Sequence, residues 1–474
     1  MQKPNIILIL IDDLGWRDLS CYGSTFYETP HLDQLAASGI LFTDAYASSP
    51  VCSPTRASIL SGKYPANVGI TNFIGGYAEG RLACVPYLNH LPLSEVSIAR
   101  ALGRAGYTTW HVGKWHLGDD DFHPDRHGFD VNIAGCHWGY PHDGYFSPYG
   151  LPTMEDGPSG EYLTDRLTDE AIRLIQGHSG APYFLNLWHY AVHIPIQSTD
   201  PLILKYRKKA DDLGLDQLET FRQGEHFPCL HKQEGRILRR LIQSDPVYAA
   251  MMENLDSNVG RLLRAVDRSG ERDNTLILFT SDNGGLATAE GSPTSNLPLI
   301  EGKGWMYEGG TRVCQLVCWP RVIQPKSRCS EPVTSPDLYP TLLAAAGLEP
   351  MPEQHQDGVS LLPLLQGGAK LARDAIFWHY PHYSNQGGTP GASIRAGDYK
   401  LIEFFEDGKL ELYNLKDDIS EQRDLSHREP ERQRELHERL VQWRESIEAK
   451  IPPPNPNYEQ QRKLPGPGAD SAEF

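Results

Sequence analysis

The sequence has no long run of apolar residues. The longest apolar run near its start, Ile6–Ile11, has six residues and ends at two acids, Asp12 and Asp13. A membrane-spanning helix needs about 20 apolar residues, and the core of a secretory signal peptide needs about 7–15. We therefore expect no membrane span. We also expect either a cytoplasmic protein or a mature periplasmic or secreted form whose leader has been removed.

Cysteine and positive charge are also scarce. The 474 residues include eight scattered cysteines, too few for a disulfide scaffold. Cys314 and Cys318 lie in an apolar run, but no second Cys or His pair completes a zinc site, so most of the cysteines are predicted to be buried free thiols. Lys and Arg number 44 against 61 Asp and Glu, a formal net charge of −17. This balance argues against a nucleic-acid partner, and an anionic substrate would need a locally basic site.

The chain does contain several apolar segments of strand length. Such segments, rich in β-branched residues, are typical of strands buried on both faces of a sheet. We expect strands at Asn5–Ile11, Tyr107–Val112, Tyr183–Trp188, Thr275–Thr280 and Val313–Trp319.

Two helical patterns separate these strands. Ser94 is a candidate cap for a helix through Ala105, and apolar positions three or four apart from Met251 to Val266 predict a second helix that ends near Gly270. Helices that alternate with buried strands indicate an α/β fold with a mostly parallel sheet flanked by helices on both faces.

The pattern changes in two places. The charged segment 200–245 is expected to form a surface insertion with solvated helices. From about residue 376, antiparallel strands are expected at Ala392–Phe404 and Lys409–Asn414, followed by a charged helix over Glu429–Lys450. The Pro-rich tail Ile451–Phe474 is expected to be ordered only by docking, if at all. We therefore predict a catalytic domain over residues 1–375 and a smaller α+β subdomain over 376–474, without internal repeats.

Polar side chains follow most of the predicted strands. In open α/β sheets, ligands bind beyond the carboxyl ends of the strands. We therefore expect seven residues, far apart in the sequence, to converge on one site: Asp12, Asp13, Lys114, His116, His193, Asp282 and Asn283.

The strongest local signal is Cys52-Ser53-Pro54-Thr55-Arg56. Pro54 is suited to the start of a helix, and a Cys at a helix N-terminus faces free N–H groups that favour an anion or an activated nucleophile. From Cys and Pro alone, a buried Cys at a capped helix is the simpler interpretation. Simple alternatives also exist for the other residues: turns for the Asp pairs, structural roles for the histidines, and a solvated loop for Lys303 between two glycines.

Together these motifs resemble the formylglycine-dependent sulfatase family. Cys-x-Pro-x-Arg resembles its first signature, and Gly106–His116 (GYTTWHVGKWH) resembles its second. The order of the remaining elements also fits: Asp-Asp near the start, a later His, Asp-Asn-Gly and then Gly-Lys-Gly. The resemblance covers nearly the whole chain, and it implies an alkaline-phosphatase-like fold.

The resemblance also implies a role for each matching residue. Cys52 would be oxidised to formylglycine by a separate generating enzyme, and the hydrated aldehyde would be the nucleophile held by Arg56. One divalent cation, calcium in this family, would be bound by Asp12, Asp13, residue 52, Asp282 and Asn283. Lys114, His116, His193 and Lys303 would surround the sulfate, with His193 as the acid for the leaving group and His116 as the base that restores the aldehyde.

The implied substrate is a sulfated carbohydrate, because the sequence is most similar to bacterial carbohydrate sulfatases, often those acting on galactose or N-acetylgalactosamine sulfates. Aromatic loops suit sugar binding, although each is equally well explained as packing. We expect substrate contacts at His137, Trp138, His142 and His382, and a contact across the subdomain interface at Arg395. Two alternatives remain: a phosphodiester or phosphonate monoester hydrolase of the same superfamily, and a non-catalytic protein that binds sulfated glycans.

Overall fold

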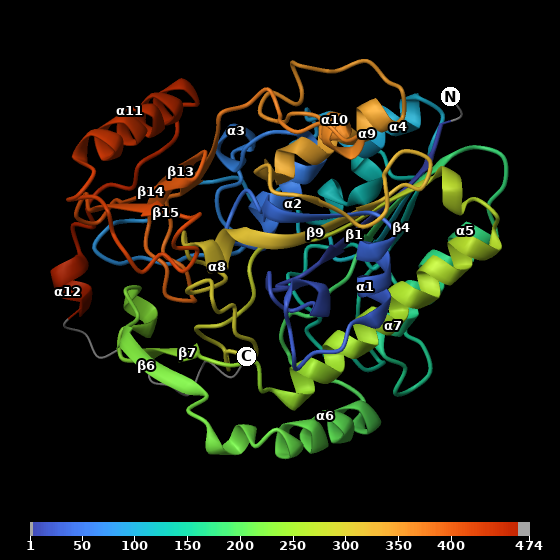
Figure 1. Cartoon of the computed structure of the whole chain (residues 1–474), viewed down its shortest axis with the longest axis horizontal. Helices are drawn as coiled ribbons and strands as arrows, with labels where there is room; N and C mark the ends of the chain where they lie inside the picture. Colours follow the sequence, from blue (N-terminus) through green and yellow to red (C-terminus); the bar gives the residue numbers. More distant parts are fainter. Residues whose placement is uncertain (1–2, 463–474) are drawn as a thin grey trace.

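A mixed nine-stranded sheet runs through the centre of the computed structural model, which describes residues 3–462 (Figure 1). The strand order is β10-β2-β9-β8-β1-β5-β3-β4, with β11 paired to β2. All pairs are parallel except those that β9 makes with β2 and β8, so the predicted mostly parallel sheet is confirmed. The strands are β1 (Asn5–Ile11), β2 (Ile40–Tyr46), β3 (Thr108–Gly113), β4 (Val131–Ile133), β5 (Tyr183–Trp188), β8 (Thr275–Ser281), β9 (Arg312–Cys318), β10 (Ser327–Cys329) and β11 (Val333–Thr334).

Helices cover both faces of this sheet. On β1, Ile7, Ile9 and Ile11 pack into one core with α1 (Pro30–Ala37), α5 (Leu163–Gln176) and α7 (Pro246–Arg268). The alternate residues Ile6, Leu8 and Leu10 pack into the opposite core. That core contains α2 (Cys52–Ser61), α4 (Ile98–Arg104), α9 (Leu338–Ala345) and α10 (Leu362–Leu365). A strand with apolar residues on both faces thus fits the two helical layers visible in Figure 1.

One predicted helix begins later than expected. Ser97, and not Ser94, precedes α4, and its hydroxyl accepts a hydrogen bond from the Arg100 backbone N–H at 3.1 Å. The other predicted helix is α7, which begins before its apolar stretch. The side chain of Asp245 caps its N-terminus by accepting hydrogen bonds from the N–H groups of Val247 and Tyr248. All eight cysteines are free, and Cys314 and Cys318 are fully buried, as predicted.

The insertion over 200–245 contains more than solvated helices. It begins with the expected helix, α6 (Asp200–Asp212), but continues into a two-stranded antiparallel ribbon of β6 (Phe221–His226) and β7 (Arg236–Arg240). The ribbon was not predicted because most of its side chains are charged or polar and few of its residues are buried, which leaves no alternating apolar pattern to detect.

The C-terminal subdomain is built on a four-stranded antiparallel sheet of β12 (Ala375–Tyr380), β13 (Gly391–Ala396), β14 (Tyr399–Phe404) and β15 (Leu410–Asn414). The single strand expected over Ala392–Phe404 is wrong: the chain turns at Gly397, whose φ of 59° favours glycine, and forms two strands. Helix α11 (Pro430–Ser446) packs on this sheet and ends before the predicted Lys450. The boundary at residues 375 and 376 stays a prediction.

The described part of the C-terminal tail docks against the segment that contains Gly80 and Leu82. Pro454 pairs with Leu82, and Asn455 donates to the Gly80 carbonyl at 3.0 Å, ahead of α12 (Tyr458–Arg462). The prediction for residues 463–474 falls on residues that the structure does not describe. The remaining short helices are α3 (Pro65–Val68) and α8 (Glu308–Thr311), and no helix within residues 3–462 is long and apolar enough to span a membrane.

Buried charges join the subdomain to the main sheet. Arg395 on β13 lies 2.7 Å from Asp44 on β2 and donates to the Tyr46 hydroxyl, so the structure bears out the contact expected across this interface. Lys400 on β14 reaches Glu308 of α8 at 2.8 Å and Glu421 at 3.0 Å, all three side chains being fully buried. The Arg395–Asp44 and Lys400–Glu308 pairs therefore tie the subdomain to the rest of the chain, and the second is fully shielded from solvent.

The N-terminus of α1 is capped from another helix. Asp256 of α7 accepts hydrogen bonds from the backbone N–H groups of His31 and Leu32 at 3.1 and 2.8 Å. Burial raises the pKa of Asp256 from 3.8 to about 6, although these N–H groups and the nearby His31 ring act to lower it and Asp33 adds to the increase. Because the folded pKa exceeds the unfolded one, this contribution to stability is complete below pH 3.8 and is lost as the pH rises through about 6.

We expect Asp256→Asn to flatten the dependence of Tm on pH between pH 4 and 7, because the amide does not titrate. Thermal unfolding at a series of pH values measures this. Asp267→Asn, an exposed position on the same helix, is the matched control and should keep the wild-type slope. An unchanged slope in Asp256→Asn contradicts the assignment.

Candidate active site

Four neighbouring parallel strands bring the predicted polar residues to one edge of the sheet. The order β8-β1-β5-β3 places the segments that follow these strands side by side. Asp12 and Asp13 follow β1, Asp282 and Asn283 follow β8, and Lys114 follows β3. The convergence expected from the sequence is present, because the carboxyl ends of parallel strands meet at the same edge.

Helix α2 presents Cys52 to this edge. Cys52 is its first residue, and Cys52 Sγ lies 3.3 Å from Nδ1 of His116. The other ring nitrogen of His116 lies 3.1 Å from the Ile74 carbonyl, and Ser53 Oγ donates to the His116 carbonyl at 2.9 Å. Burial is the main cause that raises the pKa of the Cys52 thiol and lowers that of His116. An unmodified Cys52 is therefore a protonated thiol beside a neutral imidazole.

Two cations are buried against the carboxylates beneath Cys52. Arg56, one turn after Cys52, contacts Asp282 Oδ2 at 2.7 Å and lies 3.7 Å from Asp12 Oδ1. Lys114 Nζ donates to Asp12 Oδ2 at 2.6 Å. All four side chains are fully buried, so these contacts act in a medium of low dielectric constant.

A third cation, Lys303, reaches the site from a loop. Its Nζ donates to Asp13 Oδ2 at 2.8 Å and to Nε2 of His193 at 2.9 Å, while Asn283 donates to Asp13 Oδ1 at 2.8 Å. Burial is the largest single influence and disfavours the charged form of Asp13, but Lys303 and the neighbouring polar and charged groups together outweigh it and hold the pKa of that carboxyl below its usual range. Burial, together with Lys303, lowers the pKa of His193 to about 3. His193 is thus neutral here, and Nδ1 donates to the Ile194 carbonyl at 2.9 Å.

The oxygen atoms of the site fit a hard divalent cation. Asp12 Oδ1 and Asn283 Oδ1 are buried and have no hydrogen-bond partner within residues 3–462, a costly arrangement for polar atoms unless a ligand completes it. One ligand atom from each of Asp12, Cys52 and Asp282 falls within 4.8 Å of the others. The three carboxylates are balanced by Arg56, Lys114 and Lys303, so a divalent ion would leave net positive charge for an anionic substrate.

A loop of residues 136–142 covers the imidazoles. A Cβ at Gly139 would lie 2.7 Å from Cε1 of His116, and the Tyr140 ring is parallel to that of His193 with 5.9 Å between centroids. Tyr140 was not among the residues predicted to bind substrate, since an aromatic residue before a proline gives no signal that distinguishes it from the other aromatics of this loop.

The residues predicted to bind substrate are not gathered in one place. Trp138 and His142 stack on each other at 4.1 Å in the loop over the site, and His142 is exposed. His137 is exposed and lies beside Asp120 and His123. His382 is buried, with Nε2 2.8 Å from the Thr71 hydroxyl, so its contact with substrate stays a prediction.

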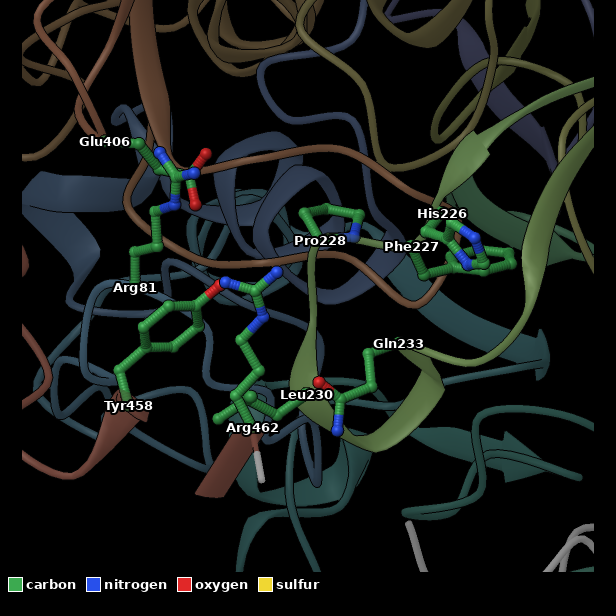
Figure 2. Close-up of a pocket in the computed structure, with 9 residues that line it drawn as sticks. All are labelled: Arg81, His226, Phe227, Pro228, Leu230, Gln233, Glu406, Tyr458 and Arg462. Carbon is green, nitrogen blue, oxygen red and sulfur yellow. The ribbon is translucent and has the colours of Figure 1, made fainter. Parts of the chain in front are cut away.

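A cavity of about 390 Å³ lies apart from these residues. It opens between the insertion and the docked tail, and Figure 2 shows Arg81, Arg462 and Tyr458 on one side with His226 and Phe227 on the other. None of the site residues described above lines it. The chemistry is therefore expected at Cys52 and not in this cavity.

Comparison with known proteins agrees with this geometry. The sulfatase family model matches residues 4–348, and the model for the C-terminal part of N-sulphoglucosamine sulphohydrolase matches residues 301–446. A sulfatase of Formosa agariphila is 33% identical over 91% of this chain and 86% of its own length. Human N-acetylgalactosamine-6-sulfatase is 33% identical over 80% of this chain and 68% of its own.

Solved structures share the architecture. Ps i-CgsB in complex with k-i-k-neocarrahexaose has a TM-score of 0.75 at 29% identity, covering 97% of both chains. The fold is thus the alkaline-phosphatase-like fold expected from the motifs. The chain belongs to the sulfatase family, and it is an enzyme of that class.

Proposed function

We propose that this sulfatase removes sulfate from a sulfated carbohydrate and that its nucleophile is a formylglycine hydrate at position 52. One observation carries the proposal: Cys52 begins a buried helix, with Sγ 3.3 Å from His116, at the point where three cations and three carboxylates converge. A separate formylglycine-generating enzyme would convert the thiol to the aldehyde. Hydration of the aldehyde then gives two hydroxyl groups on one carbon.

Arg56, Lys114 and Lys303 are proposed to hold the sulfate ester. Its negative charge is spread over oxygen atoms that must be kept in place while the S–O bonds change, and fixed positive charges provide this without reorganisation. The site is buried, which strengthens each of these interactions relative to water.

The residues present fit calcium. Asp12, Asp13, Asp282, Asn283 and the oxygen of a modified residue 52 would form an all-oxygen ligand set of the kind that calcium prefers. The ion would supply positive charge next to the sulfate oxygens. The free oxygen atoms of Asp12 and Asn283 support this assignment.

Two histidines divide the proton transfers. His193 is proposed to deliver a proton to the leaving sugar oxygen; because its Nε2 is unprotonated here and accepts a hydrogen bond from Lys303, that proton is first taken from Lys303. One hydroxyl of the hydrate gives its proton to the carboxylate of Asp282, which lies beside position 52, and attacks sulfur as the bond from sulfur to the sugar oxygen breaks, which leaves a sulfated enzyme. His116 then takes the proton of the second hydroxyl, the carbonyl re-forms and sulfate departs. A single hydroxyl at position 52 cannot complete this last step.

The carbohydrate assignment is supported by the relatives. The name of human N-acetylgalactosamine-6-sulfatase gives a sulfated amino sugar as its substrate, and Ps i-CgsB was solved in complex with a neocarrahexaose. We favour a galactose or N-acetylgalactosamine sulfate. The aromatic loop over the site, with Trp138 and Tyr140, suits stacking against a sugar ring.

The alternatives predict different substrates. Phosphonate monoester hydrolase of Agrobacterium radiobacter has the same fold with a TM-score of 0.67 at 22% identity, which bears on the fold alone. Matched sulfate, phosphate and phosphonate esters of one leaving group, and then defined sulfated sugars, test the proposal with protein confirmed to carry formylglycine. Higher kcat/KM on sulfate esters supports it. A preference for phosphate or phosphonate overturns it, and tight glycan binding without release of sulfate favours a binding protein.

We expect Tyr140→Ala to lower kcat/KM on the best sugar sulfate by about 3–10-fold, the size of one lost aromatic contact. The ring lies against His193, so the loss should fall on positioning and leave Tm unchanged. Steady-state kinetics measure it, and Tyr140→Phe, which keeps the ring, should retain wild-type kinetics. Equal activity of Tyr140→Ala and wild type on the sugar sulfate would contradict the contact.

A further inference from the structure

A second group of metal-ligating side chains lies beside the active-site loop. Asp120 begins a short 3-10 helix (Asp120–Phe122), His123 follows it, and His137 follows β4. One ligand atom from each residue lies within 4.8 Å of the others. We propose that Asp120, His123 and His137 bind a divalent transition-metal ion such as zinc, and that this ion fixes the 136–142 loop over the active site.

The state of His123 is an independent sign of a missing ligand. The residue is only 8% exposed, and its Nε2 has no hydrogen-bond partner among the residues that the structure describes. This atom lies 3.4 Å from Oδ1 of Asp120, without the alignment of a hydrogen bond. A buried ring nitrogen without a partner costs stability, and a cation between it and the carboxylate would remove that cost.

The donor set selects the class of metal. Two imidazoles and one carboxylate suit zinc and its neighbours in the first transition series, whereas calcium prefers oxygen ligands. The Asp120 side chain is 90% exposed and His137 is also exposed, so an ion can enter from solvent and complete its coordination with water. This site is therefore distinct in chemistry from the carboxylate site below Cys52.

An ion here would join the two segments that position His116. Asp120 and His123 follow His116 in the chain, and the His116 backbone N–H donates to the Cys136 carbonyl at 3.0 Å, one residue before His137. Beyond His137, Gly139 lies against the His116 ring and Tyr140 against His193. Holding His137 to His123 would limit the motion of the loop relative to both imidazoles. His137 thus acts as a positioning residue.

Zinc binding tests the site without reference to activity. Full-length protein in excess calcium is titrated with zinc against a chromophoric chelator, and bound zinc is counted by elemental analysis. We expect the wild type to bind one more equivalent than His123→Ala/His137→Ala. Asp120→Asn, a substitution at an exposed position, should weaken this equivalent by about tenfold or more. His427→Ala, which removes an exposed histidine elsewhere, should bind as the wild type does.

Cobalt spectra locate the ion, and hydrogen exchange measures its effect on the loop. Cobalt at this site should give visible bands that the double variant lacks, without the thiolate charge-transfer band expected for binding at an unmodified Cys52. Zinc should slow amide exchange over 136–142 in the wild type and not in the double variant. Equal zinc stoichiometry in wild type and double variant overturns the site, and unchanged exchange in zinc-bound wild type overturns its effect on the loop.

Discussion

Cys52→Ala is expected to lower the rate of sulfate release by at least about 10³-fold, because the nucleophile is lost while the rest of the site remains. Position 52 is buried at the start of α2, where Ala fits, so Tm should change little. Cys52→Ser should behave differently. Its single hydroxyl can attack sulfur, but no second hydroxyl is present for His116 to deprotonate, so each enzyme molecule should become sulfated once and then stop.

Mass spectrometry of the tryptic peptide Asp18–Arg56 measures both outcomes. In active wild-type protein, Cys52 should appear with an aldehyde in place of its CH2SH group, and in Cys52→Ser, after exposure to substrate, residue 52 should carry sulfate. The peptide also contains Cys21, so Cys21→Ala protein, which should stay active, leaves one cysteine to assign. Turnover by protein from the native organism with an unmodified Cys52 would contradict the proposed chemistry.

The location of the site was predictable because it depends on buried parallel strands. The apolar runs that become β1, β3, β5 and β8 are clear in the sequence, and their carboxyl ends must meet. The ten residues expected around sulfate and metal, from the strand ends and from the family motifs, do lie together: Asp12, Asp13, Cys52, Arg56, Lys114, His116, His193, Asp282, Asn283 and Lys303. Lys303 was predictable only from the family motif, since it comes from a loop that no periodicity describes.

Contacts set by packing between distant loops were not predictable. Tyr140 meets His193, and His137 meets His123, only after the loops fold over the sheet edge. The β6–β7 ribbon was missed for another reason: it buries few apolar side chains, so its pairing leaves no mark in the hydrophobic pattern. His382 was predicted from the aromatic segment around it in the sequence, but it is buried, and Tyr380 of that segment packs against its ring.

The buried ion pairs between the two sheets were equally hidden, and they lead to a large expected effect on stability. Lys400 Nζ pairs with both Glu308 and Glu421, and none of the three side chains is exposed to solvent. Burial raises the pKa of Glu421 to about 7 even with Lys400 present. Without Lys400, Glu421 keeps only the backbone N–H of Glu308 as a hydrogen-bond partner among the contacts described, at 2.7 Å.

We expect Lys400→Met to lower the free energy of unfolding by about 3–5 kcal/mol, because it removes the cation paired with buried Glu421, whereas Glu308 keeps Arg312 at 2.6 Å. Urea denaturation measures the change. Lys409→Met, an exposed lysine that pairs with Glu411, is the matched control and should cost less than about 1 kcal/mol. Lys400→Met/Glu421→Gln should recover part of the loss, since the neutral amide needs no counter-ion. Equal stability of Lys400→Met and Lys409→Met would show that these ion pairs do not stabilise the interface between the two sheets.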